Sequence, residues 1–401
     1  MTAPPLPRSP RSRGSLQRDL DALLQDAADS NVVPGVAALA VDSNGIIYEG
    51  GFGKRNSTQS TRMTPDTVVW IASMTKAITA AAAMQLVEQR SVDLDSPVAR
   101  WIPEVSRTQV LAGWDADGQP QLRPPSRPLT LRHLLTHTGG WGYDQYSTDL
   151  IRYQELRGIP RIGSCRNIAL TTPLLSDPGE CWRYGIGIDW AGKMIESVSG
   201  EKLGVYLKQN LFDPLGMSDT AFRIAPEMRA RLAKVHAHAQ GKYTPVDFEL
   251  PQEPEFEMGG GGLYSTASDY VKFMRVFLNK GRGNGNQVLK PQTVELMSRN
   301  GMGNLEVTML KTAMPHLTND VEFFPGMSKK WGLSFMINEQ ATPSGRSPGS
   351  LAWAGLANTY FWIDQTRDVA GVYMTQIRPF ADEQTLSLFL AFEKQVYQSL
   401  G

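Results

Sequence analysis

A serine and a lysine three positions apart, Ser73 and Lys76, open an alanine-rich apolar stretch that continues to Val87. If this stretch is helical, the two side chains share one face, because residues three apart lie one above the other. A serine hydroxyl becomes a good nucleophile when a neighbouring group accepts its proton, and a lysine can do so once burial lowers its pKa. Apolar residues run nearly all round the expected helix, which indicates that it is buried. The pattern therefore predicts an activated serine, although S-x-x-K alone is common by chance.

Two further sets of residues can complete such a site. Tyr184 lies on a loop before an expected helix, where a tyrosine can relay protons between nucleophile and leaving group if a lysine is near. Trp353-Ala354-Gly355 lies within an expected strand, Leu351–Ile363, and small residues there often mark the close approach of a ligand. The next N–H, that of Leu356, can pair with the Ser73 N–H as an oxyanion hole. Each feature taken singly is more simply explained by packing.

The elements that position these residues come from both ends of the chain and from its middle. At the ends we expect a helix capped by Ser15, strands over Gly35–Val41, Ile46–Gly50, Trp331–Asn338, Leu351–Ile363 and Val369–Thr375, and helices over Ser265–Asn279 and Asp382–Tyr397. In the middle we expect helices over Leu131–Thr136, Ile188–Ser199 and Lys202–Leu211, and a long loop over Asp115–Pro128. The pattern predicts an α+β fold: a flexible leader (1–14), an antiparallel sheet flanked by helices (15–72 and 258–401), and a mostly helical domain (73–257).

Composition excludes several classes of function. Lys plus Arg and Asp plus Glu number 40 each, so the net charge is zero, and the one basic cluster, Arg8, Arg11 and Arg13, lies in the expected leader. This argues against a nucleic-acid or anionic-membrane partner. No apolar run has the length of a signal peptide or a membrane span, so we expect a cytoplasmic protein. The two cysteines, Cys165 and Cys181, favour free thiols over a disulfide framework.

The order of these motifs resembles the serine β-lactamase and penicillin-binding-protein superfamily, in particular its class C-like branch. Further landmarks are Leu131–Gly140, Pro214–Met217 and Gly260–Thr266. The resemblance implies a β-lactamase/DD-peptidase-like fold with the active site between two domains, and no cofactor. It also implies that Ser73 is acylated and that Lys76 and Tyr184 together accept its proton. The N–H groups of Ser73 and Leu356 would hold the oxyanion. Which of the two is the general base stays open, because their titrations are coupled.

Two departures from the β-lactamase pattern bear on the substrate. Ile186 stands where the second motif usually has Asn, and Trp353 replaces the lysine that helps to bind a lactam carboxylate. An aromatic residue in place of a cation disfavours anionic β-lactams and suits neutral acyl groups, as in the family VIII carboxylesterases, whose third motif is Trp-Gly-Gly or Trp-Ala-Gly. We therefore expect a serine carboxylesterase acting on short- to medium-chain esters. Its substrate would be bound by Trp353, Ala354, Gly355, Tyr143 and Trp141.

Alternatives remain open. Val110–Gly118, Leu131–His137 and Tyr184–Lys193 also resemble the fungal acyltransferase that esterifies a statin precursor. The same acyl-enzyme would serve both activities, which differ in whether water or an alcohol attacks it. Weak β-lactamase or peptidase activity and a non-catalytic binding role are further alternatives. The expected partner is a small-molecule ester; its identity and the oligomeric state are left open.

Other motifs are expected to be structural. Gly345–Gly349 fits the esterase elbow G-x-S-x-G, but the elbow needs the N–H of the residue after the serine, and Pro348 has none. Lys311-Thr312-Ala313 mimics the lysine motif too early in the chain. The pairs His133/His137 and His236/His238 have spacings seen in metal sites, but no acidic cluster accompanies them. No metal is predicted.

Overall fold

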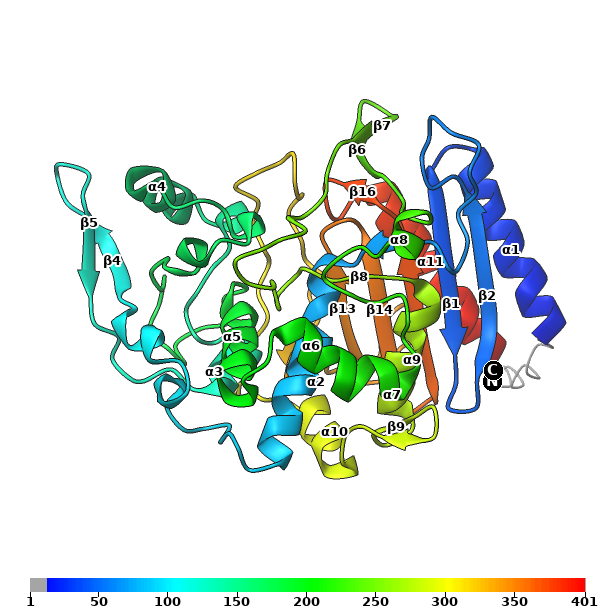
Figure 1. The fold of residues 1–401 in the computed structure, drawn as a ribbon. Coiled ribbons are helices and arrows are strands. Elements are labelled where there is room, and N and C mark those ends of the chain that lie inside the picture. The colour runs from blue at the N-terminus through cyan, green and yellow to red at the C-terminus, as the bar shows by residue number, and fades with distance from the viewer. Residues whose placement is uncertain (1–12, 401) are drawn as a thin grey trace, which may run out of the picture.

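The sheet that the sequence predicts forms the centre of the protein, for which a computed structural model describes residues 13–400 (Figure 1). It has seven antiparallel strands in the order β11-β12-β13-β14-β15-β1-β2. Their bounds are β1 Gly35–Val41, β2 Ile46–Gly53, β11 Lys329–Trp331, β12 Met336–Asn338, β13 Leu351–Gly355, β14 Thr359–Asp364 and β15 Val369–Met374. Arg8, Arg11 and nearly all of the expected leader lie outside the described residues. The expected α+β fold is confirmed.

The N-terminal hairpin and the C-terminal strands join through β1, as expected. Strand β1 pairs with β15 from Ala37 opposite Met374 to Val41 opposite Ala370, and all seven of its residues are buried. The turn before β2 is closed by Asp42, whose Oδ1 accepts the N–H groups of Asn44 and Gly45. A strand buried on both faces has no polar alternation, and the run Gly35–Val41 has none.

Helices cover both faces of the sheet. Alternate residues of a strand point to opposite faces. Tyr360 of β14 stacks on Phe389 of α11 (Glu383–Leu400), at 4.6 Å between ring centres. Its neighbour Phe361 meets Tyr270 of α9 (Ala267–Leu278) at 5.2 Å. Helix α1 (Arg13–Asp29) packs beside α11, so the two terminal helices share one face and α9 lies on the other (Figure 1).

Two of the expected strands are each broken into a pair, which corrects the sequence prediction. The segment Trp331–Asn338 turns between β11 and β12, where Ser334 has a φ of 79°. The segment Leu351–Ile363 turns between β13 and β14, where Asn358 has a φ of 57°. Asn tolerates this left-handed conformation better than most residues. Apolar residues on both sides of each turn hide it in the sequence, so Trp353-Ala354-Gly355 ends a strand.

Short strands that the sequence did not predict lie in the middle of the chain and beside the main sheet. The helices are α2 Thr75–Glu88, α3 Leu131–Leu135, α4 Thr148–Arg157, α5 Gly187–Ser199, α6 Leu203–Leu207, α7 Asp213–Leu215, α8 Pro226–Arg229 and, beyond it, α10 Pro291–Ser298. The short strands are β3 Val69–Trp70, β4 Val110–Trp114, β5 Pro120–Arg123, β6 Val235–Ala239, β7 Lys242–Val246, β8 Tyr264–Ser265, β9 Arg282–Gly283, β10 Asn286–Gln287 and β16 Ile377–Arg378.

Several expected bounds in these regions are corrected. The expected loop Asp115–Pro128 contains β5, which pairs with β4 in a projecting hairpin (Figure 1). The expected helix Lys202–Leu211 is α6 followed by a π-helical turn over Lys208–Phe212. Helix α1 begins at Arg13, two residues before the expected cap at Ser15. The division into two domains stays a prediction.

Two simpler expectations can be compared directly with the structure. Cys165 and Cys181 are both free thiols, as expected. Within residues 13–400, no helix combines the length and the apolar character needed to cross a membrane.

Candidate active site

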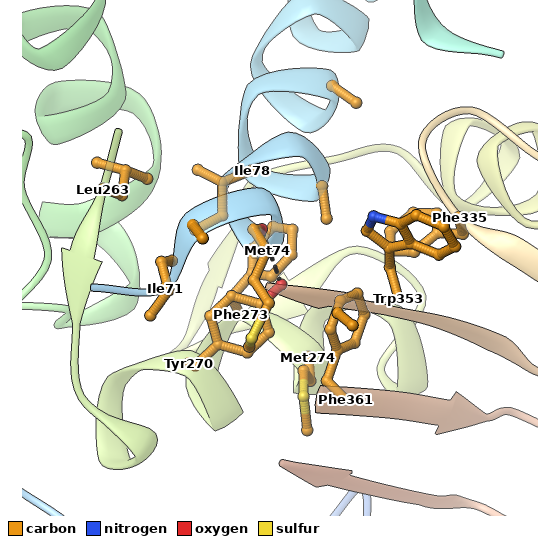
Figure 2. Packing of buried hydrophobic residues seen from close by; sticks show 14 of the residues in the cluster. Ile71, Met74, Ile78, Leu263, Tyr270, Phe273, Met274, Phe335, Trp353 and Phe361 are labelled. Atoms are coloured by element: carbon orange, nitrogen blue, oxygen red, sulfur yellow. Dashed lines mark hydrogen bonds between the residues drawn. The ribbon is translucent and has the colours of Figure 1, made fainter. Parts of the chain in front are cut away.

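Ser73 lies in a tight 3₁₀ turn, Ala72–Met74, that leads directly into α2. The expected helix therefore starts two residues later than Ser73 itself. The turn is held from below, because Met74 is fully buried and its carbonyl accepts a hydrogen bond from Tyr270 Oη at 3.0 Å. Figure 2 shows this bond and places Met74 above Tyr270, Phe273 and Phe361, with Ile71 and Ile78 in the same apolar cluster. The position of the serine is thus fixed by the core.

The end of β13 passes very close to this turn. A Cβ placed on Gly355 would lie 2.3 Å from the carbonyl oxygen of Ile71, so only glycine fits there. This is the close backbone approach that the small residues of the third motif predict. It brings Leu356, the first residue after β13, into the wall of the same cavity as Ser73.

Lys76 is fully buried beneath the serine. Its Nζ donates to Ser73 Oγ at 3.1 Å, to Tyr143 Oη at 2.9 Å and to the Gly260 carbonyl at 2.6 Å. Burial lowers the pKa of Lys76 to about 7, and the charge of Asp189 opposes that shift. A lysine with this pKa is partly neutral near pH 7, so it can accept the proton of Ser73.

Asp189 is a site residue that the sequence reasoning missed. It is fully buried in α5, and its Oδ1 accepts the Gly260 N–H at 2.8 Å while its Oδ2 has no hydrogen-bond partner in the described part of the chain. Burial raises its pKa to about 6, and Lys76 opposes the rise. The sequence feature that could have identified Asp189 is an acidic residue within an apolar helical stretch, five residues after Tyr184. The backbone N–H and carbonyl of the single residue Gly260 thus link the aspartate to the lysine.

Tyr184 is buried on the other side of the lysine, with Lys76 Nζ 4.7 Å from the centre of its ring. Its hydroxyl bonds with Ser73 and accepts the indole N–H of Trp353 at 3.0 Å. Burial raises the pKa of Tyr184, and the bonds to Ser73 and Trp353 oppose the rise. The structure therefore brings together Ser73, Lys76 and Tyr184 and adds Trp353 as a donor to the phenol.

A cavity of about 270 Å³ opens beside Ser73. Of the five residues expected to bind substrate, Tyr143 lines this cavity, and its hydroxyl also receives the bond from Lys76. Trp353 instead contacts Tyr184 and forms part of a smaller cavity. Trp141 stacks on Trp190 at 5.8 Å and donates to the Thr172 carbonyl, away from the lining of the Ser73 cavity.

The motifs expected to be structural have ordinary partners. The N–H of Ser347 donates to Asp364, and no described histidine bonds with its hydroxyl. His133 caps α3 together with Thr130, and His236 accepts the Ser57 N–H. In the described part of the chain, no group of three or more His, Cys, Asp or Glu side chains is arranged to hold a metal ion.

Known proteins share this architecture over nearly the whole chain. Monacolin J acid methylbutanoyltransferase of Aspergillus terreus is 32% identical over 399 residues, which are 94% of this chain and 95% of that protein. Lovastatin esterase of Penicillium rubens is 28% identical over 396 residues, 94% of this chain and 98% of that protein. The structure of unliganded simvastatin synthase of Aspergillus terreus has a TM-score of 0.81 at 29% identity, covering 96% of this chain and 98% of that one.

The family assignment follows from a match that spans the sheet and the serine. Residues 20–393 match the family described as Beta-lactamase, a range that includes every residue of the site above. The resemblance inferred from the motifs is therefore confirmed. The chain belongs to the beta-lactamase family and is an enzyme of its serine hydrolase and acyltransferase superfamily.

Proposed function

We propose that the protein is an acyltransferase that takes an acyl group onto Ser73 and passes it to the hydroxyl of a small-molecule alcohol. The observation that carries this proposal is the contact of Lys76 Nζ with Ser73 Oγ at 3.1 Å. Burial lowers the pKa of this lysine to about 7, so part of it is uncharged near neutral pH. Similarity to a methylbutanoyltransferase over 94% of the chain favours acyl transfer over the simple hydrolysis that the third motif predicts.

The first half of the reaction forms the acyl-enzyme. Ser73 Oγ attacks the donor carbonyl while its proton passes to the Lys76 and Tyr184 pair, and the oxyanion is held by the N–H groups of Ser73 and Leu356. Tyr184 returns the proton to the leaving group as the carbonyl re-forms. In the second half the acceptor hydroxyl gives its proton to the same pair, attacks the acyl carbon and releases Ser73 Oγ, which regains a proton.

Trp353 supports the tyrosine in this scheme. A phenol that gives up its proton is stabilised by hydrogen-bond donors, and the indole N–H at 3.0 Å supplies one. This donor is neutral, whereas the β-lactamase pattern has a lysine at the same place in the motif. The substitution keeps a donor near the tyrosine while removing a cation that would attract a lactam carboxylate.

Ester hydrolysis is the second candidate. It uses the same acyl-enzyme with water as the acceptor, and the esterase of Penicillium rubens matches 94% of the chain at 28% identity. The family VIII-like third motif, Trp353-Ala354-Gly355, supports the same activity. The two candidates differ only in the second half-reaction, so one experiment separates them.

The test follows the intact protein mass after mixing with p-nitrophenyl butyrate, with and without a competing alcohol. An adduct on the Ser73 peptide that persists until alcohol is added, with ester as product, supports acyl transfer. An adduct that water clears quickly, with acid as product, supports the esterase. Ser73→Ala should form no adduct, and the matched control Ser347→Ala should behave as the wild type. Acylation in Ser73→Ala, or no adduct and no turnover in the wild type, would overturn the proposal.

A further inference from the structure

Arg378, in β16, lies in the wall of the cavity that contains Ser73 and has no acidic partner among the described residues. Its guanidinium carbon lies 4.0 Å from the ring centre of Phe248 and 5.0 Å from that of Trp70. Its Nε is buried and makes no hydrogen bond, and no carboxylate among residues 13–400 forms an ion pair with it. The side chain is partly buried, and burying part of a cation without a counter-charge costs free energy, which a bound anion would offset.

The other charges of this wall are already neutralised. Arg161 lines the same cavity and pairs with the buried carboxylate of Asp144. Glu249 also lines it and accepts two hydrogen bonds of 2.9 Å from Arg229. The cavity wall therefore keeps one uncompensated positive charge, at Arg378. Burial and the nearby charge of Arg161 lower the pKa of Arg378 to about 10, which still leaves it charged at neutral pH.

The chemistry of this position suits a carboxylate. A guanidinium presents a planar set of N–H donors that matches the two oxygens of a carboxylate, and the pair gains strength where water is excluded. Much of the surrounding wall is apolar, including Trp70, Phe248, Leu250, Met258, Leu317 and Leu356. Such walls lower the local dielectric and leave the charge as the main polar feature away from Ser73.

We propose that Arg378 binds a carboxylate carried by the substrate that reacts at Ser73. This inference rests on the proposed function and specifies its substrate class: an acyl donor or an alcohol acceptor with a free acid group. It refines the expectation drawn from Trp353. Because Trp353 stands where the β-lactamase pattern has a lysine, the third motif carries no positive charge. Arg378 instead places a positive charge in the cavity from a different strand, β16.

Two series of probes test the proposal and identify which substrate carries the acid. The acyl series compares mono-p-nitrophenyl esters of dicarboxylic acids with the same esters capped by a methyl group. The alcohol series compares ω-hydroxy acids with their methyl esters as acceptors, with p-nitrophenyl butyrate as donor. In at least one series we expect a preference of kcat/KM for the free acid. Arg378→Gln should reduce that preference about tenfold to hundredfold, while turnover of the neutral ester changes little.

The controls separate loss of this contact from a general effect of charge. Arg152 provides a matched variant, because its guanidinium stacks 3.8 Å from the ring centre of Trp114 in the β4–β5 region, outside the cavity. Arg152→Gln should leave the preference intact. Arg378→Lys keeps the charge without the planar fork, so it should retain part of the preference. Since no acidic residue within 13–400 pairs with Arg378, replacing it leaves no described carboxylate without its partner and should not unfold the protein.

Failure of this inference is distinguishable from failure of the proposed function. No preference for the acid in either series, or a preference that survives in Arg378→Gln, would overturn the role of Arg378. If instead the wild type forms no acyl-Ser73 with the neutral ester, the proposed function fails. Calorimetric titration with glutarate then still tests the site, since binding that weakens about tenfold or more in Arg378→Gln supports a carboxylate site and no binding rejects it.

Discussion

Replacing Asp189 by Asn tests whether Lys76 is the group whose neutral form activates Ser73. Asn is nearly isosteric, and its Oδ1 can still accept the Gly260 N–H, so the geometry is retained while the charge is removed. In the wild type, Asp189 raises the pKa of Lys76 and so opposes the effect of burial. Removing that charge must therefore lower the pKa of Lys76 below about 7 and favour its neutral form at lower pH.

The size of the shift follows from how the two charges are joined. Lys76 Nζ donates to the Gly260 carbonyl, and the Gly260 N–H donates to Asp189, so the backbone of one residue separates the two charges. A neighbouring opposite charge shifts a pKa by about 1–3 units, and one separated by the backbone of an intervening residue falls at the lower end, about one unit. At about pH 6 the neutral fraction of Lys76 would then rise from roughly a tenth to roughly a half.

The assay is the pH profile of kcat/KM for a p-nitrophenyl ester between about pH 5 and 9. We expect the acidic limb of Asp189→Asn to move about one pH unit lower, with each profile normalised to its own plateau. Asp269→Asn is the matched control, since Asp269 is also buried but pairs with Lys272 on α9. A limb that stays in place or moves to higher pH in Asp189→Asn would refute the reasoning.

Three further changes have defined outcomes. Trp353→Phe keeps a ring but removes the donor to Tyr184, so kcat should fall about tenfold in steady-state assays, and an unchanged kcat would contradict the role of the indole. Burial lowers the pKa of His236, so the unfolded chain binds the proton more readily and stability falls as pH drops below about 6.5. His236→Gln can keep both hydrogen bonds without titrating, and its Tm should fall less than that of the wild type between about pH 7 and 5; equal losses would exclude His236 as a cause. Gly355→Ala would place a Cβ 2.3 Å from the Ile71 carbonyl oxygen, so urea denaturation should show a loss of about 1–3 kcal/mol, and wild-type stability would show that the turn can move.

The part of the site that local spacing determines was predictable. Ser73 and Lys76 are three residues apart on one helical segment, and their contact at 3.1 Å follows from that spacing. The antiparallel sheet was also predictable, because its strands are apolar runs separated by turn residues. The turn at Asn358 was missed, since the residues on both sides of it read as one continuous strand.

What the sequence could not show are contacts made only by packing distant segments. Asp189 acts on Lys76 through Gly260, and these three residues come from three separate parts of the chain. Arg378 faces Trp70 and Phe248 in the same way. A lone acid in an apolar helix or a lone arginine before a proline has no distinctive local pattern. The role of such a residue depends on which charges lie near it, and only the fold shows which charges these are.

The pairing of β1 with β15 has a consequence for how the protein is made. Strand β1, Gly35–Val41, is synthesised long before its partner β15, Val369–Met374, because most of the described chain lies between them. At ~5–20 residues per second, the apolar run Gly35–Val41 waits on the order of tens of seconds with one edge unpaired. Leu356, whose N–H completes the proposed oxyanion hole, arrives equally late. The nascent chain is therefore exposed to aggregation through this edge until β15 is made, and the proposed site cannot form before Leu356 is made.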